Sequence, residues 1–386
     1  MPSLCKLLAA VVVAGALPIA ALADVVLSSN DAHTVMDAQK TLVAPDQPAP
    51  DTVTVIDVKS YPPTIKATFE APGSVVGPPG AIWISKDESW GIVTSATKAD
   101  PASKPGGISP DDRVTVFDLA GAAPKVVQSL TSGLGAAQVR VSPDGALALI
   151  ANRTEGTVSV FTVKDRRLTA KGKVDTSNPK SLPSAVVFVD DKNALLTRYG
   201  DNMVNVLHID GTNVTIDPRP ITAGVAPYTI DINAAHTLAA VSNMGRGDGD
   251  DDSVSLIDLK ATPYRVVGTF GVPSGPEPMK FSPDGRFLAI GAENGSTKPT
   301  DHPFHHANGL LGLYAVEGQK LRKIAEAAVG GWIEAVAFSR DGKTVLIQSM
   351  QDHTVEAFRW DGKALSRGKI LLIRGAGPAS FATAWP

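Results

Sequence analysis

One short segment of the chain, Asp301-His302-Pro303-Phe304-His305-His306, holds three histidines and an aspartate. Imidazole and carboxylate are ligands that zinc, copper and nickel select, and imidazoles are mostly deprotonated near neutral pH. The spacing matches no established metal motif, because proline favours an extended turn here and no HExxH-like pattern is present. Two interpretations of His302, His305 and His306 therefore stay open: zinc ligands, or a solvated loop rich in histidine.

A second segment, Gly247-Asp248-Gly249-Asp250-Asp251-Asp252, concentrates carboxylates between glycines. Calcium takes six to eight oxygen ligands in flexible geometry, so Asp248, Asp250 and Asp252 are candidate calcium ligands. The residue order is not that of an EF-hand loop, and no glutamate closes the segment. A solvated acidic loop is the alternative interpretation.

A third set of candidate side chains is dispersed along the chain. Its members are Asn30, His33, Arg153, Arg198, Asp201, Arg246, Glu334, His353 and Arg374. Arginine binds carboxylate or phosphate, whereas glutamate and histidine transfer protons. We expect Glu334 and His353 to be catalytic, and Arg153, Arg198, Arg246 and Arg374 to bind an anionic substrate. The alternative is structural: Arg198 and Asp201, for example, could pair within one short loop.

A dispersed set can form one site only if the fold brings distant segments together, and the sequence contains a repeat that does so. An apolar run, a four-residue turn such as Ser142-Pro143-Asp144-Gly145, a second apolar run, a polar loop and an alternating pattern recur. Successive turns begin 57, 48, 43, 49 and 57 positions apart. This period predicts a β-propeller with four strands per repeat. The turns begin at Ser85, Ser142, Asp190, Asn233, Ser282 and Ser339.

The two ends of the chain complete one further repeat. In each repeat the strands are named a to d from the channel outwards, and a leads through the turn into b. Residues 377–385 resemble an a strand, whereas 25–30 resemble b, and 52–58 and 64–69 resemble c and d. Pairing these segments closes the ring and removes exposed sheet edges. We therefore predict an all-β, seven-bladed propeller of antiparallel strands, formed by residues 24–386 as a single domain. The other a strands are expected near 81–84, 137–141, 185–189, 228–232, 278–281 and 335–338.

Loop length distinguishes the two faces of this propeller. Because strands alternate in direction, all b–c and d–a loops emerge on one face. The b–c loops are long at residues 31–51, 97–112, 244–252 and 293–308, whereas c–d turns are short. Function tends to lie on long loops held by a rigid scaffold, so the b–c face is the candidate functional face.

Residues 1–23 have the pattern of a signal peptide. Lys6 is followed by 17 residues that are predominantly apolar, and Ala21-Leu22-Ala23 precedes Asp24. A membrane anchor is the alternative, which the short length and Pro18 disfavour. We expect cleavage after Ala23, export to the periplasm or out of the cell, and no stable membrane insertion.

The composition of the mature chain excludes several functions. The one cysteine, Cys5, lies in the signal segment, so a disulfide framework, a thiol nucleophile, c-type haem and an iron–sulfur cluster are excluded. The formal net charge is −3, and −4 without Lys6, with no basic cluster, so nucleic acid is a poor candidate partner. The five tryptophans are too few for the docking repeats of quinone-dependent propellers. We expect no organic cofactor, although the two loops above leave a divalent zinc or calcium ion open.

Three passages resemble the YVTN family and the related lactonase-type seven-bladed propellers. They are SPDGALALIANRTEGTVSVF, DDKNALLTRYGDNMVNVLHI and SPDGRFLAIGAENG. The resemblance covers the mature chain at the level of repeats, and it implies arginine, glutamate and histidine chemistry without assigning positions. It favours a lactonase- or isomerase-type enzyme acting on a small anionic, sugar-like or organic-acid substrate at the channel mouth. The alternative is a non-catalytic propeller that holds a small molecule or a periplasmic protein. We expect a monomer.

Overall fold

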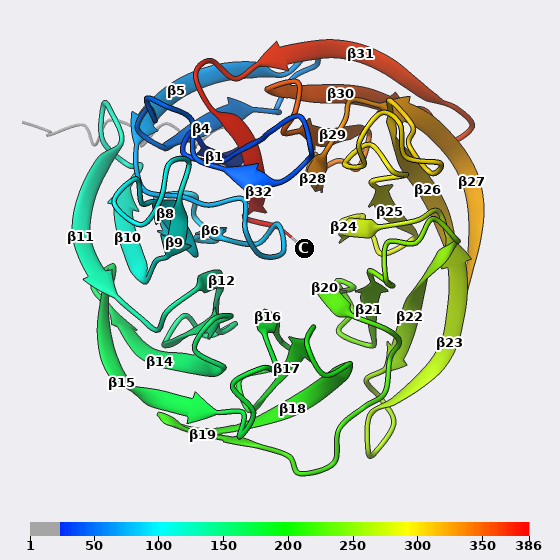
Figure 1. Ribbon diagram of the computed structural model, residues 1–386. Coiled ribbons are helices and arrows are strands. Elements are labelled where there is room, and N and C mark those ends of the chain that lie inside the picture. Colours follow the sequence, from blue (N-terminus) through cyan, green and yellow to red (C-terminus); the bar gives the residue numbers. More distant parts are fainter. Residues whose placement is uncertain (1–23, 386) are drawn as a thin grey trace, which may run out of the picture.

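The computed structural model describes residues 24–385, which form seven four-stranded antiparallel sheets around a central channel (Figure 1). The predicted seven-bladed propeller is confirmed, whereas the predicted signal peptide lies outside the described residues. Within residues 24–385, no helix has the length and apolar character needed to cross a bilayer. From inner to outer strand, the first blade consists of β32 (Gly377–Thr383), β1 (Val25–Asp31), β4 (Thr52–Asp57) and β5 (Thr64–Glu70), and the second of β6 (Ile82–Ile84), β7 (Trp90–Thr94), β10 (Arg113–Asp118) and β11 (Lys125–Thr131). In the same order, the third blade consists of β12 (Ala136–Val141), β13 (Leu147–Asn152), β14 (Thr157–Lys164) and β15 (Arg167–Asp175), the fourth of β16 (Pro183–Phe188), β17 (Asn193–Arg198), β18 (Met203–Asp210) and β19 (Asn213–Ile216), and the fifth of β20 (Pro227–Ile232), β21 (Leu238–Asn243), β22 (Asp252–Asp258) and β23 (Arg265–Val272). The sixth blade consists of β24 (Pro276–Phe281), β25 (Phe287–Ala292), β26 (Gly309–Glu317) and β27 (Lys320–Val329), and the seventh of β28 (Ile333–Phe338), β29 (Thr344–Ser349), β30 (Thr354–Trp360) and β31 (Leu365–Leu372).

The ring closes as the strand order predicts. Strand β32 pairs with β1 in antiparallel register, with Ser28 opposite Phe381. Across the neighbouring blade, the Gln348 side-chain amide donates to Ser28 Oγ at 2.8 Å and to the Ser380 carbonyl oxygen at 3.2 Å. Both ends of the described chain are therefore tied to the same blade and to the blade beside it.

The recurring turns share one hydrogen-bond arrangement, which explains their sequence. Ser142 Oγ donates to Asp144 Oδ1 at 2.6 Å and accepts the Leu147 amide at 2.9 Å, so the serine closes the turn from inside. The turns that begin at Ser85, Ser282 and Ser339 repeat it. In the altered copy at Asn233, the side-chain oxygen accepts two amides instead. The side chain of the first residue thus fixes the passage from strand a to strand b.

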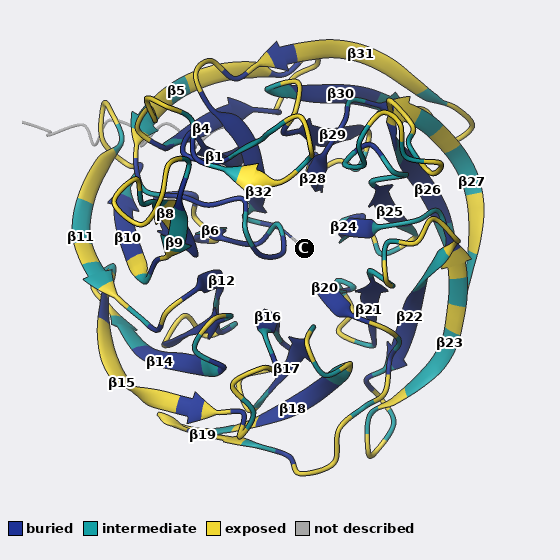
Figure 2. Cartoon of the chain, viewed as in Figure 1, coloured by how far each residue is buried: buried dark blue, intermediate teal, exposed yellow. Residues whose placement is uncertain are grey.

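Burial follows strand position within each blade (Figure 2). Strand β13 is buried at all six positions, whereas most positions of β15, the outermost strand of the same blade, are exposed. Neighbouring blades pack face to face, so the middle strands are covered on both sides and read as continuous apolar runs. Each interface between blades holds its own apolar cluster, and this keeps the inner strands fixed around the channel.

The loops also divide the two faces as predicted. The face with the b–c and d–a loops is called the mouth face, and the opposite face, with the a–b and c–d turns, is called the turn face. Two long b–c loops contain short hairpins that the repeat pattern did not predict. They are β2 (Val35–Met36) with β3 (Leu42–Val43), and β8 (Thr97–Ala99) with β9 (Ile108–Pro110).

Candidate functional site at the channel

The inner strands present equivalent positions to the channel. In β16, β20, β24 and β28, the first residue pairs with the end of strand b, and the register then shifts before pairing resumes at the fourth residue. The second residue therefore lies inside a β-bulge at the mouth end, and bulges change the direction of a side chain. The four residues at this position are polar: Ser184, Tyr228, Glu277 and Glu334.

Glu277 and Glu293 form a pair of neighbouring carboxyl groups, and each affects the pKa of the other. Glu277 lies in β24, and Glu293 follows β25 of the same blade. Burial raises the pKa of Glu277 well above its usual value, and the charge of Glu293 and a hydrogen bond between the two groups raise it further. Burial also raises the pKa of Glu293, but hydrogen bonds from Thr297 and Glu277 oppose the rise. These directions favour Glu277 as the protonated member of the pair and Glu293 as the ionised member.

Glu334 supplies a third carboxyl group to the same end of the channel. It is 1% exposed, and its Oε2 atom has no hydrogen-bond partner within the described chain. Burial raises the pKa of Glu334 well above its usual value, and Glu277, Glu293 and Asp31 add to the rise, whereas the Trp332 indole opposes it. These effects favour the neutral carboxylic acid, which can donate a hydrogen bond.

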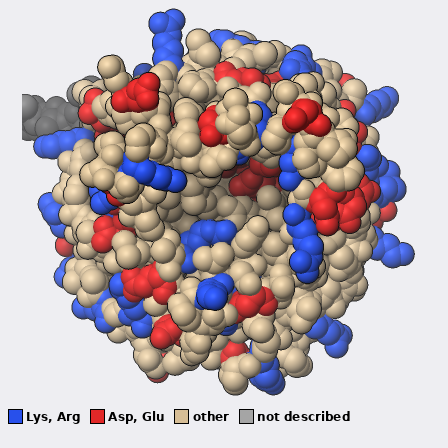
Figure 3. Space-filling model, in the orientation of Figure 1, with Lys and Arg blue, Asp and Glu red and all other residues tan. Residues whose placement is uncertain are grey.

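Arg153 adds a cation to this group of acids. It follows β13 in a b–c loop, and its guanidinium carbon lies 4.6 Å from the ring centre of Tyr199 and 5.4 Å from that of Tyr228. Arg153 Nη1 donates to Ser184 Oγ at 2.5 Å. Both rings and the serine orient the guanidinium, and its charge opposes the rise in the pKa of Glu277. The mouth cluster is defined here as Arg153, Tyr199, Tyr228, Glu277, Glu293 and Glu334. Figure 3 shows the mouth face hollowed at its centre, with acidic atoms on one side of the hollow and basic atoms on the other.

Two segments of the first blade form a cap beside the mouth cluster. Val75 and Val76, in the loop between β5 and β6, pack with Trp332, Met350, Ala379 and with Met36 of the β2–β3 hairpin. Lys40, at the tip of that hairpin, donates to Gln351 Oε1 at 2.8 Å, and its charge lowers the pKa of Glu293. The hairpin therefore places a cation near the carboxyl pair.

The cap loop is held by a buried group of Asp31, His33 and Asp51. Asp31 Oδ2 accepts the Val75 amide at 2.8 Å, and Asp51 Oδ2 accepts the Gly73 amide at 3.2 Å. The His33 ring contacts both carboxylates, with Nδ1 2.9 Å from Asp51 Oδ1. Burial raises the pKa of Asp31 to about 6. Hydrogen bonding to Asp51 and the charges of both carboxylates raise the pKa of His33, although burial opposes them.

These three side chains have the atoms to bind a divalent metal, since one ligand atom from each lies within 4.8 Å of the others. The hydrogen bonds give them a different role. Both oxygens of each carboxylate accept hydrogen bonds from backbone amides. Asp31 accepts those of His33, Thr34 and Val75, and Asp51 accepts those of Ala32 and Gly73. A metal would have to displace these bonds, so the group fits its role in fixing the cap loop better than that of a metal centre.

Several residues of the predicted dispersed set are engaged in structural contacts. Arg198 forms an ion pair with Asp201 and donates to Asn205 Oδ1 at 3.1 Å. Asn30 is buried and hydrogen bonded to Ser28, Thr52 and Thr54. The geometry of Arg198 and Asp201 therefore matches the structural interpretation, in which the two side chains pair within one short loop.

Other predicted residues lie away from the mouth cluster. His353 lines a cavity of 220 Å³ with Asp31, Thr34 and Gly377, and that lining includes neither Glu334 nor Arg153. Arg374 is exposed between β31 and β32. Arg246 lines a separate cavity of 380 Å³ together with Asp248, Asp250 and Asp252. The structure thus brings Glu334 and Arg153 to one site and places His353, Arg246 and Arg374 elsewhere.

The two candidate metal loops touch one another, because a Cβ atom on Gly249 would meet the ring of Phe304 at 2.1 Å. The histidine Nδ1 atoms bond to separate backbone groups. That of His302 accepts the Phe304 amide, whereas those of His305 and His306 lie 3.0 Å from the Lys298 and Asn294 carbonyl oxygens. In the acidic loop, a hydrogen bond to Asp248 raises the pKa of Asp250, and burial raises that of Asp252. Metal binding by either loop stays a prediction.

Sequence reasoning missed Glu277, Glu293, Tyr199 and Tyr228. The predicted strand began at Pro278, which left Glu277 outside it. A usable signal was present: a carboxylate stands at the same position of two inner strands, in Pro276-Glu277-Pro278 and in Ile333-Glu334-Ala335. Glu293 carried a weaker signal, because it belongs to a long loop rich in polar residues.

Comparison with solved structures identifies the fold. A periplasmic gluconolactonase from Pseudomonas aeruginosa is 17% identical with a TM-score of 0.66, over 94% of this chain and 99% of its own. A protein from Bacteroides uniformis, provisionally named a 6-phosphogluconolactonase, is 13% identical with a TM-score of 0.71, over 93% and 98%. A functionally unknown protein from Desulfotomaculum acetoxidans is 13% identical with a TM-score of 0.69, over 94% and 100%. No family model and no curated protein matches the chain. At these identities the similarity establishes the propeller fold alone.

Proposed function

We propose that the mouth cluster hydrolyses a small lactone, the cyclic ester of a sugar-like acid or of another organic acid. The observation that carries this proposal is the set of two buried carboxyl groups, Glu277 and Glu334, and a half-buried third, Glu293, beside an oriented arginine at one end of the channel. Neighbours with the same fold include a periplasmic gluconolactonase, and this supports the choice of substrate class. The repeat-level similarity to YVTN propellers is part of the same proposal.

The chemistry needs one base and one acid, and the carboxyl pair supplies both. Glu293, as the ionised partner, takes a proton from water while the water oxygen attacks the lactone carbonyl carbon. The bond between the carbonyl carbon and the ring oxygen then breaks, and Glu277 or Glu334 protonates the departing alkoxide. The product is an open-chain hydroxy acid. Arg153 binds the carbonyl oxygen as it gains negative charge, or an anionic group of the substrate.

The test is a pH-indicator assay with gluconolactone and related lactones. Glu293→Gln and Glu277→Gln are expected to lower kcat roughly 10²- to 10⁴-fold, because each removes one proton-transfer group. Arg153→Lys retains the charge but loses the planar contact with two rings, so we expect a higher KM. Glu317→Gln, at the exposed end of β26, is the matched control and is expected to retain activity. Undiminished turnover in Glu293→Gln would exclude the proposed base.

Two further outcomes are informative. His353→Ala tests the sequence-based prediction that His353 transfers protons, and a loss of 100-fold or more would restore that role. If no lactone is turned over but hydroxy acids raise the melting temperature of wild type and not of Arg153→Lys, the non-catalytic binding propeller is the better description.

Export is proposed together with this activity. The pattern of residues 1–23 supports it. N-terminal sequencing of the protein from a periplasmic fraction is expected to begin at Asp24. Full-length protein retained in membranes would contradict cleavage.

A further inference from the structure

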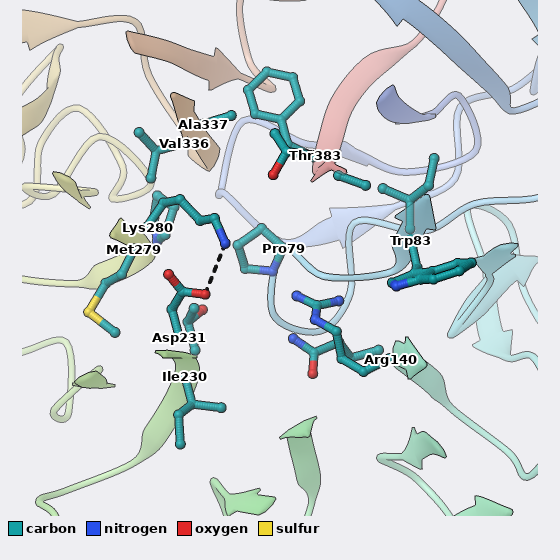
Figure 4. Close-up of a pocket in the computed structure, with 16 residues that line it drawn as sticks. Pro79, Trp83, Arg140, Ile230, Asp231, Met279, Lys280, Val336, Ala337 and Thr383 are labelled. Carbon is teal, nitrogen blue, oxygen red and sulfur yellow. Dashed lines mark hydrogen bonds and ion pairs between the residues drawn. The ribbon is translucent and has the colours of Figure 1, made fainter. Parts of the chain in front are cut away.

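The inner strands carry a second set of charged residues at the opposite end of the channel. In β12, β20 and β24 the fifth residue is Arg140, Asp231 or Lys280. The fifth position is three residues beyond the second, or about 10 Å along a strand, towards the turn face. Figure 4, seen from the turn face, shows these three side chains projecting towards one another from three blades.

The three residues line an enclosed cavity of 180 Å³. Its volume equals that of about six molecules of liquid water, which suits a small ligand better than a drug-sized one. Apolar side chains form much of the remaining wall. These are Ile82, Trp83, Ile230, Met279, Val336 and Phe381. Such walls strengthen electrostatic interactions inside the cavity.

The hydrogen bonds leave one edge of Arg140 available. Its Nη1 atom donates to the Gly80 carbonyl oxygen at 3.1 Å and to that of Val139 at 2.8 Å, which uses both Nη1 hydrogens. Within the described chain, Nε and Nη2 form no hydrogen bond, and no carboxylate lies within 4 Å of the guanidinium. The Nε–Nη2 edge is one that can bind an oxyanion through two parallel hydrogen bonds.

Asp231 does not neutralise both cations. Its Oδ1 atom lies 3.1 Å from Lys280 Nζ, and its Oδ2 atom accepts the Phe281 amide at 2.8 Å. Both oxygens are therefore satisfied by blade β24–β27, and the cavity has one uncompensated positive charge. Burial lowers the pKa of Arg140, because loss of hydration disfavours its charged form. A bound anion would offset this unfavourable desolvation free energy.

We propose that the turn-face cavity binds a small oxyanion, a carboxylate or a phosphate, between the Nε–Nη2 edge of Arg140 and the ammonium of Lys280. This site is separate from the mouth cluster and does not depend on the lactonase proposal. The ligand presents one or two oxygen atoms to each of these two cationic groups, and it is about the size of phosphate, acetate or a three-carbon acid.

The experiment is isothermal titration of the mature protein with sodium phosphate and, separately, with sodium acetate. Arg140→Gln is expected to weaken binding roughly 10- to 100-fold, since it removes two charge-assisted hydrogen bonds, and Arg140→Lys to weaken it less. Arg322→Gln, at an exposed surface position, is the matched control and is expected to bind as wild type does, whereas Arg153→Gln tests whether the anion binds at the mouth face instead. Binding of phosphate alone, acetate alone or both identifies the source of the oxyanion.

Three results would overturn the proposal. These are no binding of either anion to wild type, unchanged binding in Arg140→Gln, and loss of binding in Arg153→Gln alone. The last would place the anion at the mouth face. Circular dichroism and the melting temperature of each variant establish that it is folded. If Arg140→Gln does not fold, Arg140→Lys and Lys280→Gln provide the comparison, and unchanged binding in both would equally overturn the proposal.

Discussion

At the scale of residues, two arginines of similar sequence context have different roles. Arg153 and Arg198 each stand at or just after the end of a b strand, but their partners differ. Arg153 contacts two aromatic rings and a serine, so its charge is not neutralised by a carboxylate. Arg198 is paired with Asp201 inside its own loop. A guanidinium without a carboxylate partner is available to a substrate, whereas a paired one stabilises the loop.

The Arg198–Asp201 pair therefore gives a stability prediction. The two side chains are 9% and 15% exposed, so Arg198→Met leaves an almost buried carboxylate without its partner. We expect the free energy of unfolding to fall by about 3 kcal/mol, with unchanged KM in the remaining folded protein. Arg322→Met breaks an exposed pair with Glu317 and is expected to change stability by less than about 1 kcal/mol. Urea denaturation measures both variants. A raised KM with unchanged stability would instead support the sequence-based role of Arg198 in binding substrate.

The residue types of the site could be predicted better than their grouping. Glu334 and Arg153 were predicted because each is a charged residue near a strand end that faces the mouth. Glu277 was missed because the β-bulge that directs it into the channel has no pattern of its own in the sequence. His353 was grouped with Glu334 because both were expected on the mouth face, but loop conformation, with φ of 55° at His353, decides where that side chain lies.

At the scale of elements, the Ser-x-Asp-Gly turn depends on backbone conformation as well as on hydrogen bonds. Gly145 has φ of 76°, and no atom lies within 4 Å of the position a Cβ would take. Gly145→Ala is therefore sterically accommodated, but its backbone is strained. We expect a loss of about 1 kcal/mol in the free energy of unfolding. Gly271→Ala is the matched control, because it also has open space but no left-handed φ, and we expect little or no loss there. Equal urea midpoints for the two variants would show that the turn tolerates the strain.

The elements themselves could be predicted from the repeat because each one obeys local rules. The turn residues specify the a–b connection, and strands buried on both faces read as apolar runs, as in Leu147–Asn152. Ring closure followed from an incomplete repeat at each end. The β2–β3 and β8–β9 hairpins were not predictable, since each has only two or three residues per strand and is stabilised by the surrounding loops.

At the scale of the whole molecule, carboxyl groups with raised pKa values dominate the titration between pH 4 and pH 7. Asp31 is raised from 3.8 to about 6 by burial, and Glu88 from 4.5 to about 7, mainly by burial. The pKa values of Glu277 and Glu334 are also raised, mainly by burial. In this range the folded state binds more protons than the unfolded state, so the free energy of unfolding falls as pH rises. Carboxylates with lowered pKa values, such as Asp144, Asp284 and Asp341, act in the opposite direction but below about pH 4.

We therefore expect the protein to be more stable at pH 5 than at pH 8, by about 1.4 kcal/mol from Asp31 alone, because at pH 5 the unfolded-state carboxyl is already largely ionised. Glu334→Gln isolates one contribution, because glutamine resembles the neutral acid and cannot ionise. This variant is expected to be at least as stable as wild type at pH 8 and to lose less stability between pH 5 and pH 8. Glu317→Gln, whose carboxylate has a lowered pKa through its hydrogen bond with Arg322, is expected to follow the wild-type pH dependence over this range. Urea midpoints at the two pH values measure each variant. Higher stability of wild type at pH 8 than at pH 5 would show that the buried carboxyl groups are ionised and compensated in the folded protein, and the mouth cluster would then hold no neutral acid.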